Sequence, residues 1–479
     1  MGISCQLRVG DDMIYKPGIG RMKDDCMIYR NGTYYLFSMY QKPGSDEFRH
    51  IWLATSKDGI HFEDYGCVVE DFPELIWAMK VYEADGIYYM NSGSFCENGR
   101  QAVLKFWKSE DLLHWEYCPE LDVVSPELEN EKTRLDCMCV LKHDGKYYGY
   151  ATGQYGFLIS DDGAHWTPNP CNIDYTPFPP YNTALGGFEI ADFIELDGTF
   201  YLLCGGFGHL GTNGYGVYLY ESKHPEGPFT PCLPFYRING TSKRWVNMWE
   251  RCFEKDGQLL AHNYMYNGYS YECGDVYLPP IKKLQKTEEK LSLAWWDGNN
   301  AMYGGIVKTC DSLISESSSY SVFDDTKNQC DFSELLSIPN ATIIEFNMTL
   351  SENTFTNYSQ GGFFLAETET DGSAVLFDTY GKCEIVHIKD GKIQSVEDVI
   401  GFGSTAPYYI TSGKTYSVRI LAKNGLFELY VNDLYLQTFN NAHMPESLAN
   451  AFLYFGAASV RNSCTLSNLR IYDMKGDKS

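Results

Sequence analysis

One short pattern occurs five times in the first part of the chain. In each copy an apolar strand runs into a two-residue turn that ends in glycine, and an aromatic-rich strand follows. The five turns are Asn31-Gly32, Asp85-Gly86, Asp144-Gly145, Asp197-Gly198 and Asp256-Gly257. Such dipeptides favour tight hairpins because both residues can adopt positive φ. Self-similarity with a spacing of 53 to 59 residues indicates a repeat architecture.

A second pattern follows the first three hairpins and combines a polar turn with an aromatic residue. Its copies are TSKDGIHFE at 55–63, KSEDLLHWE at 108–116 and ISDDGAHWT at 159–167, and a degenerate copy follows the fourth hairpin at 221–230. Each unit therefore contains about four strands, which is typical of a β-propeller blade. Five hairpins predict five blades.

After residue 295 the repeat stops and strand-like runs return with a different rhythm. Several of them alternate apolar and polar residues between 343 and 474, and Asn424-Gly425 joins two of them as a hairpin. This pattern predicts two packed antiparallel sheets. We therefore predict an all-β protein, with a five-bladed β-propeller at 1–295 followed by a C-terminal antiparallel β-sandwich of the concanavalin-like type at 296–479.

The composition restricts the partners and the cofactors. A net charge of −25 argues against nucleic acid and membrane surfaces as partners. No apolar run is long enough to span a membrane, and the start of the chain lacks the apolar core of a signal peptide. The 16 cysteines and 10 histidines show no metal-binding spacing, so we expect no metal and no other cofactor. We expect reduced cysteines in a cytoplasmic protein, or a secreted protein if the N-terminus has been trimmed.

Three carboxylates lie at matching positions in the repeat. Asp24, Asp136 and Glu189 precede the first strand of the first, third and fourth hairpins, eight or nine residues before the turn glycine. The first strand of a propeller blade starts at the central funnel, so these side chains should converge. Each alone could be a solvated residue at the start of a strand. Together they are typical of glycoside hydrolysis, which needs one ionised carboxylate and one protonated acid.

The sequence around these acids resembles glycoside hydrolase family 32. The segment at 21–40, RMKDDCMIYRNGTYYLFSMY, is similar to that family's W-M-N-D-P-N-G opening, and 133–148 resembles its R-D-P block. The segment at 186–203, GGFEIADFIELDGTFYLL, is similar to the W-E-C-P-D-F block, and 51–66 to the W-G-H-A stretch. The resemblance implies a five-bladed propeller followed by a β-sandwich. It also implies a retaining hydrolase that releases terminal β-fructofuranosides from fructans, other oligosaccharides or small glycosides.

The resemblance implies a role for each acid. Asp24 matches the nucleophile, Glu189 matches the general acid/base, and Asp136 matches the residue that binds sugar hydroxyls and stabilises the transition state. Arg134 is a weaker match because one leucine separates it from Asp136. Asp192 matches the acidic residue that closes the fourth-blade block, and it could contact the sugar or be a solvated residue at the start of a strand.

The residues beside Asp24 depart from the family pattern. The family's Trp and Asn are replaced by Arg21 and Lys23, and its Pro by Asp25. Lys23 could face an anionic sugar, or it could be an ordinary charge at the start of a blade. Asp25 is an alternative to Asp24 as the residue that faces the funnel. Successive strand residues point to opposite faces, so only one of the two should do so. The spacing from the turn and the family match favour Asp24.

Four more residues are candidates for contact with the sugar. Glu250 begins the fifth blade at the corresponding place and could line the funnel. Gln41, Trp52 and Trp77 could also bind sugar, but each could equally pack within a blade.

Two other functions stay open at this point. Family 43 enzymes share the propeller and the three acids, resemble residues 24–37 nearly as well, and invert configuration on arabinofuranosides or xylosides. Their carboxyl groups lie about 6.5–9.5 Å apart, against about 5–5.5 Å in a retaining enzyme. Asp192 and the sandwich favour family 32. The third possibility is a carbohydrate-binding propeller that has lost catalysis, because the residues around Asp24 are altered.

Overall fold

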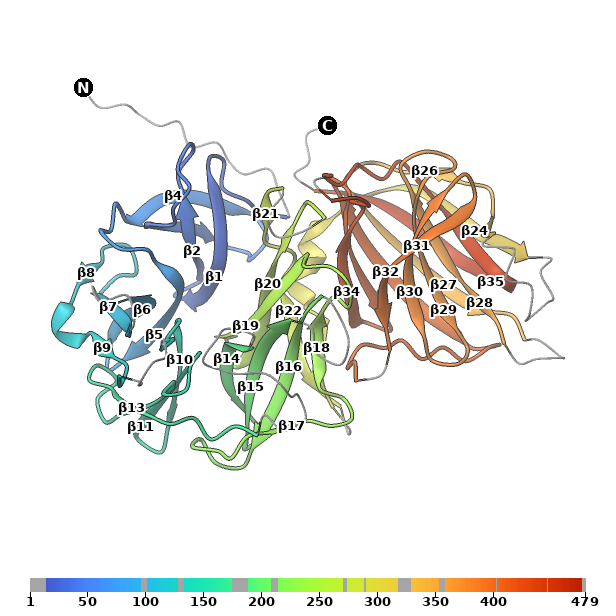
Figure 1. Cartoon of the computed structure of the whole chain (residues 1–479). Coiled ribbons are helices and arrows are strands. Elements are labelled where there is room, and N and C mark those ends of the chain that lie inside the picture. Colours follow the sequence, from blue (N-terminus) through green and yellow to red (C-terminus); the bar gives the residue numbers. More distant parts are fainter. Residues whose placement is uncertain are drawn as a thin grey trace, which may run out of the picture.

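The computed structural model describes residues 14–95, 101–127, 133–174, 188–207, 214–269, 274–287, 290–317, 329–352, 358–401, 403–445 and 447–475. Within these ranges the regular elements are strands and short 3-10 helices, among them η1 (Pro119–Leu121) and η4 (Asp297–Met302). The all-β class is therefore confirmed. The strands form two bodies side by side, a ring of sheets and a sandwich (Figure 1).

Four separate sheets make up most of the ring. The first contains β1 (Arg21–Arg30), β2 (Thr33–Gln41), β3 (His50–Ser56) and β4 (Phe62–Val69). The second contains β5 (Trp77–Ala84), β6 (Ile87–Phe95), β7 (Ala102–Ser109), β8 (Glu116–Tyr117) and β9 (Val123–Val124). The third contains β10 (Met138–His143), β11 (Lys146–Ala151), β12 (Phe157–Ser160) and β13 (Thr167–Asn169). The fourth contains β14 (Phe188–Leu196), β15 (Thr199–Phe207), β16 (Tyr215–Ser222), β17 (Thr230–Pro231) and β18 (Arg237–Gly240).

The hairpin turns have the geometry that their sequence predicts. The first residue of every turn has φ between 47° and 51°, and the glycine has φ between 68° and 86°. Two residues with positive φ make a turn whose twist matches that of the flanking strands. The second pattern also repeats in three dimensions, because Asp58, Asp111 and Asp162 each accept hydrogen bonds from the backbone two and three residues further on.

The fifth hairpin does not form a separate blade, so the prediction of five separate blades is corrected to four. Its strands are β19 (Asn247–Lys255), β20 (Gln258–Tyr266), β21 (Val276–Tyr277) and β22 (Lys282–Lys286). They continue through β23 (Leu291–Trp295), which pairs with the C-terminal sheets at Ala294 and Leu434. The fifth hairpin still closes the ring, because β19 packs against both β1 and β14.

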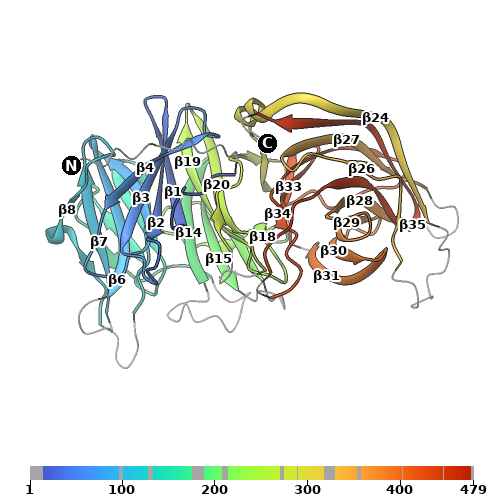
Figure 2. The ribbon, with the colours of Figure 1, turned by 90° about the horizontal axis from the view of Figure 1, so that it is seen from above.

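The C-terminal strands form two layers that share one apolar core. They are β24 (Tyr303–Ser317), β25 (Asp331–Phe332), β26 (Leu336–Ser337), β27 (Thr342–Leu350), β28 (Gln360–Ala366), β29 (Gly372–Asp378), β30 (Cys383–Lys389), β31 (Lys392–Ile400), β32 (Thr415–Lys423), β33 (Leu426–Val431), β34 (Leu434–Asn440) and β35 (Tyr454–Met474). The long strand β35 pairs with β28 in one layer and with β24 and β27 in the other. Figure 2 shows β24 and β27 in one layer and β29 to β31 in the other. Side chains from both layers, such as Phe346 and Phe363, pack in one cluster, which is the arrangement of a β-sandwich.

The ring and the sandwich are joined through a continuous buried contact. One apolar cluster includes Leu260 of β20 together with Ile343 of β27 and Tyr430 of β33. A buried ion pair crosses the same boundary, since Lys282 Nζ lies 2.8 Å from Glu428 Oε2 and both side chains are at most 2% exposed. The predicted domain boundary at residue 295 falls between β23 and η4.

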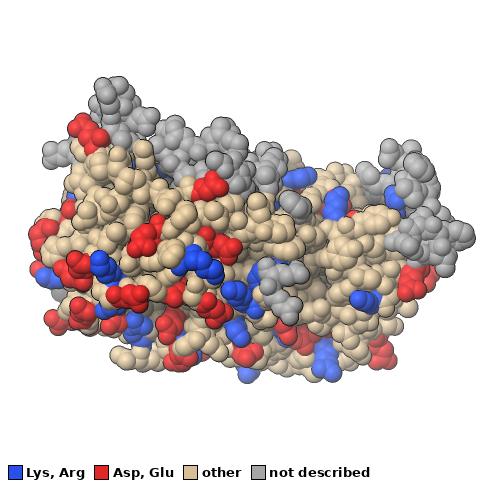
Figure 3. Space-filling view, turned by 90° about the horizontal axis from the view of Figure 1, so that it is seen from below, with Lys and Arg blue, Asp and Glu red and all other residues tan. Residues whose placement is uncertain are grey.

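The surface carries charges of both signs. Basic and acidic side chains are interspersed over the face seen from below (Figure 3). In the part of the chain that the structure describes, no helix has the length and apolar character needed to cross a membrane.

The buried ion pair between ring and sandwich gives a first prediction. Lys282→Met would leave the Glu428 carboxylate buried without its cation, so the free energy of unfolding should fall by about 3–5 kcal/mol. The matched control is Lys108→Met, because Lys108 and Glu116 form an exposed pair that should contribute at most about 1 kcal/mol. Urea denaturation followed by tryptophan fluorescence measures both variants. Equal effects of the two substitutions would show that the pair at 282 and 428 does not brace the two bodies.

Candidate active site

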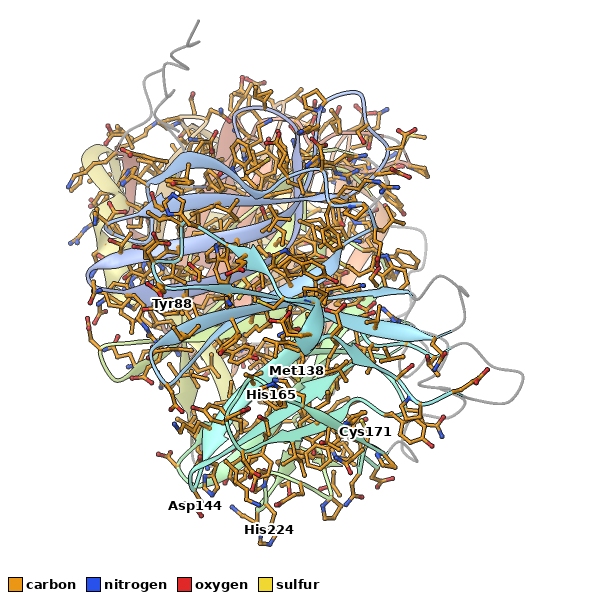
Figure 4. All side chains as sticks on the ribbon, turned by 90° about the vertical axis from the view of Figure 1, so that its left-hand side faces the viewer. Tyr88, Met138, Asp144, His165, Cys171 and His224 are labelled. Carbon is orange, nitrogen blue, oxygen red and sulfur yellow. The ribbon has the colours of Figure 1, made fainter. Side chains whose placement is uncertain are left out.

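Arg134 joins two of the three predicted carboxylates. Its Nε donates to Asp136 Oδ1 at 3.0 Å, and its Nη2 donates to Asp136 Oδ2 at 2.6 Å and to Glu189 Oε1 at 2.7 Å. Asp24 lies close enough for its charge to raise the pKa of Glu189. The structure therefore brings all three acids together, from β1, from the segment before β10 and from β14. In Figure 4, β10 runs from Met138 near the middle of the view to the turn at Asp144 at the lower edge.

Asp24 is directed by a β-bulge in β1. The pairing with β2 shifts between Lys23 and Cys26, and Asp24 has φ 49°. The same positive φ recurs eight residues before the turn glycine in two other first strands, at Ala78 of β5 and Trp249 of β19. The bulge is thus a property of the repeat, and the first blade uses it to re-aim a carboxylate. The Tyr264 hydroxyl donates to Asp24 Oδ1 at 2.5 Å, which leaves Oδ2 facing Lys23 at 3.8 Å.

The neighbouring acids point away from this group. Asp25 is 3% exposed, and its Oδ2 lies 2.9 Å from Nδ1 of the buried His262. Glu250 follows the corresponding bulge in β19, is fully buried, and accepts a hydrogen bond from Asn239. Burial raises the pKa of Glu250 to about 7. These contacts argue against a sugar-binding role for Asp25 or Glu250, because both carboxyl groups are buried and have partners within the ring.

Glu189 is set up to hold a proton. Burial is the main cause that raises the pKa of Glu189, the charges of Asp136 and Asp24 raise it further, and Arg134 opposes them. The Tyr215 hydroxyl lies 3.3 Å from Glu189 Oε2, and burial raises the pKa of Tyr215, so this hydroxyl stays a donor. Gly205 pairs with Glu189 across the sheet, and a Cβ there would lie 1.6 Å from the Tyr215 oxygen. Glycine is therefore needed opposite the acid.

The other predicted sugar contacts divide into two groups. Trp52 stacks on Tyr40 with ring centroids 4.6 Å apart and donates to the Tyr15 hydroxyl, so it packs within the first blade. Gln41 donates to the Ser45 carbonyl at 2.6 Å, which is a loop contact. These contacts argue against the sugar-binding roles predicted for both residues, because their polar groups are used locally.

Trp77 remains a candidate for contact with a sugar. Trp77 pairs across the sheet with Gly93, which lies seven residues after the turn glycine of that hairpin. Glu189 has the equivalent position in the fourth blade, because its partner also lies seven residues after a turn glycine. A Cβ on Gly93 would lie 2.3 Å from the Leu135 carbonyl oxygen and 2.8 Å from Asp136 Cα. The strand pair that carries Trp77 therefore packs directly on the segment that carries Asp136.

Asp192 is a structural residue, which corrects its predicted role. It lies 2.7 Å from Lys80 Nζ, accepts from the Cys252 amide, and is 2% exposed. Burial disfavours the charged lysine, but the Asp192 carboxylate holds the pKa of Lys80 above its usual value. The residue six positions before each turn glycine belongs to this same buried layer, which consists of Cys26, Lys80, Cys139, Asp192 and Arg251.

This buried layer and two tyrosines near the acids were not predicted from the sequence. Arg251 donates to the Met79 carbonyl and, at 2.8 Å, to the Cys137 sulfur, so the layer closes the axis with polar contacts. The layer could have been predicted, because each of its five residues lies six positions before a turn glycine. Tyr215 and Tyr264 had no such signal, because strand pairing within the fourth sheet brings Tyr215 to Glu189, and packing of β20 against β1 brings Tyr264 to Asp24. Among the described residues, no group of three His, Cys, Asp or Glu side chains is arranged to hold a metal ion.

The buried layer gives a second prediction. Asp192→Ala would leave Lys80 buried without its carboxylate, so the free energy of unfolding should fall by about 3–5 kcal/mol. Glu221→Ala, at an exposed position of the same blade, should change it by no more than about 0.5 kcal/mol. Thermal melting of both variants is the measurement. Wild-type melting of Asp192→Ala would instead favour a role at the ligand.

Comparison with known proteins identifies the fold. No family model and no curated protein sequence matches the chain. Among solved structures, the family 32 beta-fructofuranosidase of Bombyx mori is similar with a TM-score of 0.68 at 12% identity, covering 98% of this chain and 95% of that one. Sucrose-6-phosphate hydrolase from Lactobacillus gasseri has a TM-score of 0.65 at 14% identity, with coverage of 98% and 93%.

A third solved structure shows the same likeness. Fructan 1-exohydrolase IIa from Cichorium intybus has a TM-score of 0.63 at 12% identity, covering 99% of this chain and 98% of that one. At these identities the likeness concerns the fold. The resemblance predicted from the sequence motifs is confirmed at that level: over nearly its whole length the chain has the fold of family 32 glycoside hydrolases.

Proposed function

We propose that this protein is a glycoside hydrolase that releases a terminal β-fructofuranoside with retention of configuration. The observation that carries the proposal is the Arg134 bridge between Asp136 and Glu189 beside Asp24. The bridge links Glu189, whose pKa is raised, to Asp136, and Asp24 lies beside them. Glycoside hydrolysis needs such a set, with one protonated acid and one ionised carboxylate. The fold shared with fructoside-cleaving enzymes supports the choice of substrate.

The contacts assign one role to each acid. Asp24 attacks the anomeric carbon through Oδ2, because Oδ1 is held by Tyr264. Glu189 protonates the leaving oxygen and then takes a proton from the water that hydrolyses the fructosyl-enzyme. Both oxygens of Asp136 are held by Arg134, and their remaining lone pairs can accept hydrogen bonds from sugar hydroxyls. Trp77 offers an aromatic wall beside Asp136.

A third prediction tests the two central roles. Asp24→Asn and Glu189→Gln should each lower fructose release from sucrose, inulin or levan by about 10³-fold or more. Glu63→Gln, an exposed carboxylate of the first blade, is the matched control and should keep wild-type activity. Sugar release and the anomeric configuration of the first product are measured together.

The same assay separates the rival functions. Release of arabinose or xylose from aryl glycosides with inversion would make Asp24 a general base. Binding of oligosaccharide without turnover of any of these substrates would make the propeller a binding module. Activity that survives in Asp24→Asn would overturn the assignment of the nucleophile.

A fourth prediction concerns pH. Glu189 must be protonated to act as the acid, so the alkaline limb of the kcat/KM profile follows its pKa. Arg134 lowers that pKa against the effect of burial. Arg134→Met should therefore raise the pKa of Glu189 and move the alkaline limb to higher pH, while the maximal rate falls. Arg30→Met, an exposed arginine paired with Glu83, should leave the limb in place. A shift of the limb to lower pH in Arg134→Met would contradict the assignment of the acid.

A further inference from the structure

The outer face of one sandwich layer carries a polar hollow of about 530 Å³. Its floor consists of β32, β27 and β35, and β27 pairs with both of the others. Phe346 and Val418 turn their side chains into the apolar core, so the residues on either side of them point outward into the hollow. The volume lies within the range of small-molecule sites, about 300–1,000 Å³. These strands belong to the sandwich, whereas β1 and β14, which carry Asp24 and Glu189, belong to the ring (Figure 1).

A fixed group of opposite charges lines one part of the hollow. Arg419 Nε lies 3.1 Å from Glu345 Oε1, and Arg419 Nη1 lies 2.7 Å from Asp433 Oδ1. The guanidinium carbon of Arg419 is 4.2 Å from the centre of the Trp295 ring, and the Tyr303 hydroxyl donates to Glu345 Oε1 at 2.6 Å. These contacts hold the guanidinium and both carboxylates in place before a ligand arrives, which lowers the entropic cost of binding.

Three other lining side chains have hydrogen-bonding groups that the protein leaves open. Arg470 lies opposite Glu345 in the strand pairing, but within the described ranges its guanidinium makes no ion pair, hydrogen bond or ring contact. The side-chain amides of Asn347 and Asn468 make no hydrogen bond within these ranges either. Asn468 reaches the hollow through a bulge, because the pairing of β27 with β35 shifts between Glu345 and Asn347 and Asn468 has φ 54°. Bulges often re-aim a side chain toward a binding site.

The lining favours a ligand that is polar and uncharged. Its charged residues are two arginines and two carboxylates, so the formal charges balance: Arg419, Arg470, Glu345 and Asp433. Phe346 and Val418 are buried and offer no surface to an apolar ligand. Each floor strand is paired on both sides, β32 with β27 and β33 and β35 with β24 and β27, so no strand edge is open to a peptide backbone.

We propose that this hollow is a second, non-catalytic binding site for a neutral oligosaccharide. Each sugar hydroxyl both donates and accepts, which matches amides that do both, carboxylates that accept and a guanidinium that donates as a fork. Arg470, Asn347 and Asn468 bind these hydroxyls. The inference does not rest on the assignment of Asp24 as the nucleophile. On a long polysaccharide, occupation of both sites by one chain raises the effective concentration of the substrate at the acids.

Binding without turnover tests the inference. The Asp24→Asn protein, full-length and checked for loss of hydrolysis, is titrated by calorimetry with short neutral oligosaccharides derived from inulin, levan, arabinan and xylan. We expect at least one of them to bind at a site that Arg470→Met and Asn347→Ala, each added to Asp24→Asn, weaken about tenfold. Arg470→Lys should retain part of the affinity. Melting temperatures of all variants show that the fold is kept.

The matched control is Arg461→Met, which removes an arginine of the same strand that does not line the hollow. It should leave the affinity unchanged, and a carboxylated oligosaccharide should bind no more tightly than its neutral counterpart. The inference is overturned if no neutral oligosaccharide binds, if Arg461→Met weakens binding as much as Arg470→Met, or if the charged probe is preferred. The polar residues then serve only to hydrate the outer face of the sheet.

The second site and the proposed function fail on different measurements. Hydrolysis that requires Asp24, without any binding that responds to Arg470→Met, would leave the hydrolase standing and overturn the second site. Binding that responds to Arg470→Met, without hydrolysis of any substrate by the wild type, would support the second site and overturn the hydrolase.

Discussion

The geometry of the hairpin turns fixes where every first strand of the ring begins. Because the turn residue and its glycine both have positive φ, each hairpin has the same register next to its turn, and residues at similar distances from the glycine reach similar depths in the ring. Six residues before the glycine lies a buried layer that includes Lys80 and Asp192. Eight or nine residues before it lie Asp24, Asp136 and Glu189. The buried layer thus closes the axis directly beneath the acids.

The protonation and the orientation of the three acids depend on the residues that contact them. Arg134 holds Asp136 and Glu189 on one guanidinium, and its positive charge offsets the repulsion between the two carboxyl groups. Burial and the remaining negative charge keep the pKa of Glu189 raised. Tyr264 orients Asp24 from the last hairpin of the ring, so the position of the proposed nucleophile depends on closure between β1 and β20. Catalytic geometry and ring closure are therefore coupled.

The sequence predicted the features that repeat and missed those that arise from packing between repeats. Turn chemistry predicted the hairpins, and the position of Asp24, Asp136 and Glu189 eight or nine residues before a turn glycine predicted their convergence. The bulge at Asp24 has no signal in the sequence, so Asp25 stays an alternative to Asp24 there and Glu250 a candidate for the funnel, although both side chains are buried. The sequence leaves Asp192 open as a sugar contact or a solvated residue, because its partner Lys80 lies in another blade, 112 residues away. The fifth blade was counted as separate because pairing of β23 with β34 has no local signal.

Trapping the covalent intermediate tests the central claim most directly. In Glu189→Ala, hydrolysis of the fructosyl-enzyme should be slow, so incubation with a fructoside that has a good leaving group should add one fructosyl unit to the protein. The account predicts that peptide mass spectrometry finds this unit on Asp24. A protein that releases fructose from the same compound without any adduct, or that carries the adduct on another residue, would contradict it.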